Sequence, residues 1–176
     1  AALFVACGDD GTDDETPPPA VPTIALDGGD IDQPQEITNP MSVKIGVTAP
    51  GAIAGFTVTI DSPALTAEML AAVGLATELN LVNPGSMALG ALGFPSGEAV
   101  SGKTALTFDI SKLVPMIAQI YNETSDHKFI LKVTDAKGKS TTKTLTCHLT
   151  GKVALAYNND ADLWANTATV TAANVP

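Results

Sequence analysis

One stretch of the chain matches a phosphate-binding pattern letter for letter. Residues 97–104, Gly-Glu-Ala-Val-Ser-Gly-Lys-Thr, fit G-x-x-x-x-G-K-[ST]. Such a loop binds phosphate only between a strand and a helix, because the helix N-terminus must face the anion. Here the residues after Thr104 alternate as in a strand, and those before Gly97 form a glycine-rich loop. We therefore predict a chance match and no nucleotide as a partner.

A second set of residues could bind metal ions. Calcium prefers oxygen ligands, which four acids near the N-terminus could supply: Asp27, Asp30, Asp32 and Glu36. Their spacing is not that of an EF-hand loop, so a solvated turn is the favoured interpretation and calcium stays the alternative. The histidines, His127 and His148, could meet across a hairpin, but no third ligand stands at a diagnostic spacing. We predict two exposed strand histidines, no metal and no cofactor.

The sequence contains neither of two common catalytic motifs. The chain has neither a G-x-S-x-G elbow nor an H-E-x-x-H helix. We predict that the protein is not an enzyme, with no catalytic residue. A hydrolase is the weaker alternative, and its active site would need a concave cluster of polar side chains within residues 83–102.

The two cysteines, Cys7 and Cys147, lie nearly a whole chain apart. This separation gives neither a disulfide framework nor a C-x-x-C metal site. Cys147 lies in residues 145–149, where odd positions are apolar and even ones polar, so we predict a buried residue on the inner face of a strand. Cys7 fits no strand or helix pattern, and it stands between the apolar run Leu3–Ala6 and a run of acids.

The residues around Cys7 resemble the lipobox of bacterial lipoproteins, although Phe4 stands where leucine is usual. The resemblance implies that residues 1–6 are a signal-peptide remnant and that Cys7 is acylated, with the membrane as its partner. The next residues are similar to the signal that exports Bacteroidetes-type lipoproteins to the outer face of the outer membrane: Gly8, Asp9, Asp10, Asp13, Asp14 and Glu15. A disordered acidic tail with an incidental cysteine is the alternative.

Charge is distributed unevenly along the chain. The formal net charge is −10, but residues 1–36 hold nine acids and no lysine, while the other residues carry ten acids and all nine lysines. The body is therefore nearly neutral. Because the chain has no arginine and no basic stretch, we exclude nucleic acid as a partner.

The segment from Thr16 to Pro22 contains four prolines, three of them consecutive. Such a run favours an extended polyproline II spacer. We predict that residues 7–22 are an acidic, proline-rich tether. No stretch has the roughly 20 apolar residues of a membrane-spanning helix.

From Thr23 onward, short alternating segments bounded by turn residues predict a mainly β protein. The predicted strands are residues 23–26, 42–48, 53–60, 104–110, 127–134 and 140–150. Gly138 supplies the turn of the last hairpin, and residues 83–102 are predicted as a loop.

Two short helices interrupt the predicted strands. The first spans residues 65–74, with Thr66 as N-cap, Leu65 and Leu70 as a hydrophobic staple, and Gly74 as the stop. The second begins at Ser111 as N-cap. Its predicted buried stripe has helical spacing and consists of Ile110, Leu113, Val114, Ile117, Ile120 and Tyr121.

The turn in residues 133–138 is similar to that of many bacterial immunoglobulin-like domains. About 125 residues resemble the N-terminal domain of uncharacterised Bacteroidetes surface lipoproteins, through residues 62–75, 81–85, 108–111 and 134–136. The resemblance implies an immunoglobulin-like β-sandwich over residues 23–150 with two helical insertions. In that family a domain associated with carbohydrate metabolism often follows. Residues 151–176 are then the start of a second β domain or additional edge strands.

Together these expectations predict a lipid-anchored binding or presentation module of the cell surface. Its possible partner is a glycan or an envelope protein. Two alternatives stay open: an adhesin or fimbria-like structural subunit, and a plain spacer for a following domain. An exposed hydrophobic strand edge would favour the first of these.

Overall fold

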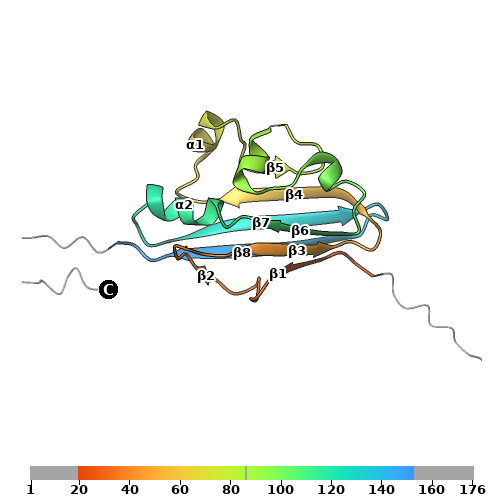
Figure 1. Ribbon diagram of the computed structural model, residues 1–176, viewed down its shortest axis with the longest axis horizontal. Coiled ribbons are helices and arrows are strands. Elements are labelled where there is room, and N and C mark those ends of the chain that lie inside the picture. Colours follow the sequence, from red (N-terminus) through yellow and green to blue (C-terminus); the bar gives the residue numbers. More distant parts are fainter. Residues whose placement is uncertain (1–19, 86, 153–176) are drawn as a thin grey trace, which may run out of the picture.

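The computed structural model describes residues 20–85 and 87–152, which form two β-sheets and a few short helices (Figure 1). The three-stranded sheet has the order β1-β3-β6, with β1 Thr23–Leu26, β3 Lys44–Thr48 and β6 Ala105–Asp109. The five-stranded sheet has the order β2-β8-β7-β4-β5, with β2 Gln35–Glu36, β8 Ser140–Leu149, β7 Ser125–Asp135, β4 Ile53–Asp61 and β5 Glu78–Asn80. Within the described ranges, β2 and β8 pair in parallel and every other pair is antiparallel.

Both sheets contribute side chains to one core. Along β4, Phe56, Val58 and Ile60 are buried, as the alternating pattern predicts. Phe56 meets Phe108 of β6 edge to face, with ring centroids 5.8 Å apart. One ring comes from each sheet, so side chains of both sheets meet in this core. Cys147 of β8 is fully buried in the same core, which confirms its predicted position.

Helix α1 (Ala67–Ala72) forms as predicted. The Oγ1 atom of Thr66 accepts a hydrogen bond from the Met69 N–H, 3.3 Å away, and so caps the first turn. Gly74 ends the helix with a φ of +77°, a conformation that glycine adopts without steric cost. Leu65 and Leu70 are both buried.

Helix α2 (Leu113–Ile120) corrects two predictions. The N-cap position is held by Lys112, without a side-chain hydrogen bond, and not by Ser111. The Ser111 hydroxyl instead accepts a hydrogen bond from the Val43 N–H at 2.7 Å, which ties the start of the helix to the strand region. The predicted stripe was also too wide, because Ile120 is largely exposed.

The segment predicted as a loop contains regular structure. It holds the 3₁₀ helices η1 (Met87–Leu92) and η2 (Gly97–Ala99), and the short strand β5 precedes it. Gly93 lies directly against the carbonyl oxygen of Asp109 with a φ of +91°, so a side chain at this position would collide with β6. The lack of a side chain at Gly93 therefore allows the segment to lie directly against the three-stranded sheet.

The β7–β8 hairpin turns at residues 136–139, with Gly138 at a φ of +76° as predicted. The buried side chain of Asp135 organises the turn, because its Oδ1 accepts hydrogen bonds from the N–H groups of Lys137 and Lys139. Its Oδ2 lies against Gly51 and is buried without a hydrogen-bond partner among the described residues.

The described chain begins and ends at opposite ends of the molecule (Figure 1). Near its start, the Pro22 carbonyl accepts a hydrogen bond from the Thr141 hydroxyl, beside the hairpin turn. At the end of the described chain, the Lys152 N–H donates a hydrogen bond to the Asn122 carbonyl at 3.1 Å, near the first residues of β7. The eleven residues of β7 separate these points, a length of roughly 35 Å.

Candidate functional site

The predicted anchor lies outside the described residues. This applies to Cys7, to the residues of the export signal and to the segment 153–176. Across residues 20–85 and 87–152, no helix is long and apolar enough to cross a membrane.

Three of the four acids weighed as calcium ligands, Asp30, Asp32 and Glu36, contact different partners. Asp32 forms an ion pair with Lys143 of β8, and the Asp30 carboxylate accepts a hydrogen bond from the Asp32 N–H at 3.0 Å. Glu36 faces His148 and accepts a hydrogen bond from the Thr150 hydroxyl. The part of the chain that the structure describes contains no group of three or more His, Cys, Asp or Glu side chains placed to hold one metal ion.

The phosphate-loop match lacks the structure that such a site needs. Residues 97–99 form the 3₁₀ helix η2, and β6 follows from Ala105. A strand stands where the helix should begin, so among the described residues no helix follows the loop to face a phosphate. The prediction of a strand after Thr104 is therefore confirmed.

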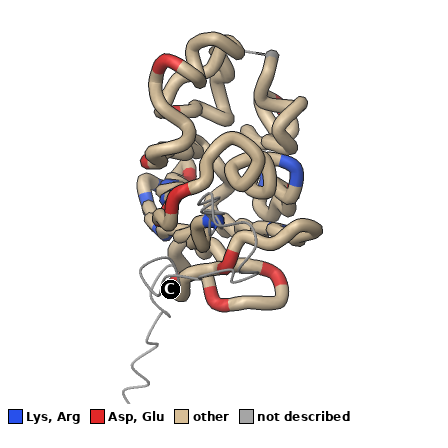
Figure 2. The backbone as a smooth tube through the Cα atoms, turned by 90° about the vertical axis from the view of Figure 1, so that its left-hand side faces the viewer, with Lys and Arg blue, Asp and Glu red and all other residues tan. Residues whose placement is uncertain are grey.

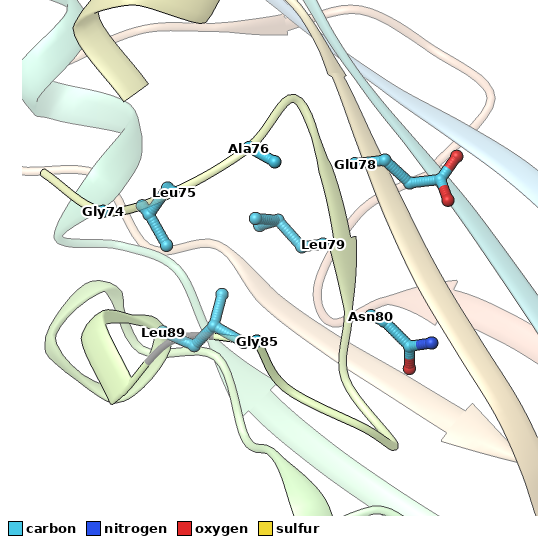
Figure 3. Close-up of a pocket in the computed structure, with 8 residues that line it drawn as sticks. All are labelled: Gly74, Leu75, Ala76, Glu78, Leu79, Asn80, Gly85 and Leu89. Carbon is cyan, nitrogen blue, oxygen red and sulfur yellow. The ribbon is translucent and has the colours of Figure 1, made fainter. Parts of the chain in front are cut away.

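A pocket of about 290 Å³ lies beside the edge strand β5 (Figure 3). Leu75, Leu79 and Leu89 contribute its apolar wall. The carboxylate of Glu78 and the amide of Asn80 point away from these leucines (Figure 3). The Asn80 side chain already accepts hydrogen bonds from the backbone N–H groups of residues 82 and 83.

This pocket lies partly under the 83–102 segment, where a hydrolase site was considered. Its two lining polar side chains come from β5, and the segment itself contributes Gly85 and Leu89. The lining therefore offers apolar contact and no convergent polar cluster. Sequence reasoning missed the pocket because β5 has only three residues, too few for an alternating pattern to be recognised.

The best-organised polar cluster surrounds His127 of β7, which is fully buried. The prediction of an exposed histidine was therefore wrong. Its Nδ1 lies 2.7 Å from the Ser62 hydroxyl oxygen, and its Nε2 lies 3.0 Å from that of Ser125. The Tyr121 ring packs edge-on against the imidazole, with centroids 6.0 Å apart.

The hydrogen-bond partners fix the tautomer of His127. The Ser62 oxygen already accepts the backbone N–H groups of Ala64 and Leu65, at 3.2 and 3.0 Å, so its own proton goes to Nδ1. Nε2 then carries the ring proton and donates to Ser125, whose hydroxyl donates to the Glu123 carbonyl at 3.2 Å. Burial lowers the pKa of His127, and the imidazole is neutral.

A serine hydroxyl on a neutral imidazole is also the pair used in nucleophilic catalysis. Here the ring is fully buried, and its second nitrogen donates to Ser125, where a catalytic triad would have a carboxylate. The Ser62 oxygen is in addition occupied by two backbone N–H groups. The arrangement fits a structural bridge that joins the start of the α1 segment to β7.

His148 occupies the opposite face of the hairpin. Its Nδ1 lies 2.7 Å from Oδ1 of Asp126, and its Nε2 lies 3.9 Å from Oε1 of Glu36. The hydrogen bond to Asp126, supported by the charge of Glu36, raises the pKa of His148. His127 is paired with Cys147, and successive residues of a strand point to opposite faces, so His148 lies on the other face of the sheet. The two histidines therefore do not form the metal pair that was considered.

Comparison with known proteins finds no family model that matches this chain and no curated protein that matches it at a significant level.

Proposed function

We propose that this chain is a lipid-anchored module of the bacterial cell surface that presents the polypeptide following residue 152 and has no catalytic activity. The observation that carries the proposal is the position of the two chain ends. The described chain begins at one end of the molecule and ends at the other (Figure 1). A module entered at one end and left at the other holds the following segment a full strand length, roughly 35 Å, from its attachment point.

The fold in this proposal is an immunoglobulin-like β-sandwich. When β1, β3, β4, β6, β7 and β8 are given the letters A, B, C, E, F and G, strands A, B and E share one sheet and C, F and G the other. This distribution corresponds to that of constant-type immunoglobulin domains without strand D. The contact between Phe56 and Phe108 supports face-to-face packing of the two sheets.

Residues 7–22 supply the anchor and tether. Cys7 carries the lipid, the acidic residues behind it direct export to the outer face of the outer membrane, and the prolines keep the spacer extended. The tether leads into β1 through Pro22, whose carbonyl is held by Thr141 at the hairpin end of the molecule. That end therefore faces the membrane in this proposal.

Fatty-acid labelling in cells tests the anchor, and the two cysteines provide a matched pair of variants. Cys7→Ser should abolish incorporation of labelled palmitate and release the protein from the membrane fraction. Cys147→Ala should retain both, because this thiol lies in the core. Labelling that persists in Cys7→Ser would overturn the anchor. Protease added to intact cells should degrade the protein, and resistance until lysis would exclude surface exposure.

A second candidate function is binding of a glycan or an envelope protein at the β5 pocket, favoured by its volume of about 290 Å³. Ala76 lines this pocket and is exposed, so Ala76→Phe should fill it without disturbing the core. A glycan-array signal that Ala76→Phe removes and Ala72→Phe, on α1, retains would establish this site. An array without signal would leave presentation as the function.

A fimbria-like subunit fits the geometry less well. The edge strands of the five-stranded sheet, β2 and β5, have two and three residues, and β5 exposes Glu78 and Asn80. Short, polar edges hinder strand addition between molecules. Light scattering should therefore give a monomer, and ordered polymers would favour the fimbrial alternative.

A further inference from the structure

Helices α1 and α2, at the end of the molecule where the described chain finishes, expose apolar side chains. Among the fourteen residues of α1 and α2, the single charged one is Glu68. Four large apolar side chains are between 42% and 60% exposed: Met69 and Val73 at α1, and Met116 and Ile120 on α2. We call these four residues the α1–α2 patch. A helix with so little polar surface is normally covered.

Hydrogen bonds and ring packing around His127 hold the two helices at the same end. The hydroxyl of Ser62, which precedes α1, forms a hydrogen bond with Nδ1 of His127. Tyr121, the C-cap residue of α2, packs on the imidazole ring of His127. Figure 1 shows α1 and α2 on the same side of the molecule. Figure 2 looks onto this end, and the uppermost part of the tube is tan with few red segments and no blue. Both helices therefore lie at this end of the molecule, and neither contains a basic residue.

The chain leaves the described fold beside this patch. The Gly151 N–H donates to the Thr124 hydroxyl at 2.9 Å, and the Lys152 N–H donates to the Asn122 carbonyl, two residues beyond α2. Lys152 therefore lies close to the C-terminal end of α2.

The following 24 residues have a composition that suits the patch. They include the only tryptophan of the chain, one of its two tyrosines and no lysine. The large apolar residues closest to Lys152 in sequence are Val153, Leu155, Tyr157, Leu163 and Trp164. Trp164 stands twelve residues beyond Lys152, a reach of up to about 40 Å, which exceeds the roughly 12 Å length of α2.

We propose that residues 153–176 dock on the α1–α2 patch, with Trp164 as the main apolar contact. The patch and the segment are both poor in charge, and the hydrophobic effect favours their association. The chain connection raises the effective concentration of the segment at the patch. The proposal is independent of the lipid anchor and of any glycan.

Fluorescence of Trp164 in the full 176-residue chain tests the proposal, because no other tryptophan contributes. Acrylamide quenching should be about threefold weaker in the native chain than in Met69→Glu or Ile120→Glu, since burial of a tryptophan hides most of its surface. Val21→Glu is the matched control, because Val21 is equally exposed at the opposite end. It should quench like the unsubstituted chain, and far-UV circular dichroism should show all four chains folded.

Three results would overturn the proposal. Quenching that is equal in all four chains and as strong as in urea would mean that Trp164 is not docked. Protection that survives both Met69→Glu and Ile120→Glu would place it on another surface. Protection that increases with protein concentration, together with a dimer in light scattering, would make a second copy of the chain the occupant.

Discussion

In the β7–β8 ladder, His127 is paired with Cys147, and one step along the ladder His148 is paired with Asp126. The first pair faces the core and both residues are fully buried. The second pair lies on the outer face, where His148 has a carboxylate on each side. The pKa of His127 is lowered and that of His148 is raised. A single step in strand position therefore reverses the protonation preference of the same side chain.

The two faces of this sheet separate two kinds of polar interaction. On the inner face, hydroxyl groups satisfy an uncharged imidazole, and the network holds the α1 segment to the sheet. On the outer face, opposite charges pair in contact with water, where such pairs contribute little to stability. Changes to the inner pair should therefore have the larger effects.

The largest expected effect concerns the thiol of the inner pair. Burial raises the pKa of Cys147 from 9.0 to about 12, which lowers its thiolate fraction roughly a thousandfold. In Cys7→Ser, where Cys147 is the single cysteine, a thiol reagent at pH 8 should react at least that much more slowly with the native chain than with the chain in urea. Similar rates would show that the inner face of the ladder opens to solvent.

The next effect is on stability. His127→Ala should lower the free energy of unfolding by about 3 kcal/mol, because it leaves a cavity and removes the partner of Ser62 and Ser125. Urea unfolding followed by circular dichroism measures the loss. His148→Ala is the matched control on the outer face and should lose clearly less. Equal losses in the two variants would contradict the distinction between the faces.

Stability should depend on pH with opposite signs for the two histidines. The pKa of His127 in the folded state lies below its value of about 6.5 in the unfolded state. The contribution of neutral His127 to the free energy of unfolding is therefore complete above pH 6.5 and is lost as the pH falls below 6.5. The charge of Asp126 raises the pKa of His127 and the charge of His148 lowers it, so these two smaller effects oppose each other. The contribution of His148 is present below pH 6.5 and is lost as the pH rises through its raised pKa.

Urea titrations from pH 5 to 8 measure this dependence. The difference in unfolding free energy between the unsubstituted chain and His127→Gln should decrease as the pH falls from 7 to 5. The corresponding difference for His148→Gln should decrease as the pH rises. Parallel slopes for the two variants would contradict the assigned protonation states.

Much of the fold could be predicted because the longer strands alternate. Residues 53–60 and 127–134 showed which side chains are buried, and the same pattern contained the correct position of His127. Its odd number places it on the face of Phe129, Leu131 and Val133, and the expectation that histidines are exposed overrode that signal. The Thr66 cap was also predictable, because its hydrogen bond joins residues only three apart.

Features that depend on distant contacts could not be predicted. Ser111 has the residue type of an N-cap, but its hydroxyl accepts a hydrogen bond from Val43, which is 68 positions away in sequence. The β5 pocket and the α1–α2 patch likewise depend on packing between separate segments. Ile120 fits the helical stripe by spacing, and only the packed structure places it at the surface.

The smallest expected effect is on the outer pair itself. Asp126→Asn removes the charge that Nδ1 of His148 meets at 2.7 Å, so the pKa of His148 should fall back towards 6.5 in an NMR titration. Glu36→Gln should cause a smaller shift, because its carboxylate is 3.9 Å from Nε2. The urea midpoint at pH 7 should change only slightly in either variant, since both carboxylates are exposed to water. A large loss of stability in Asp126→Asn would mean that the outer face stabilises the hairpin as the inner face does, and the contrast between the two faces would then fail.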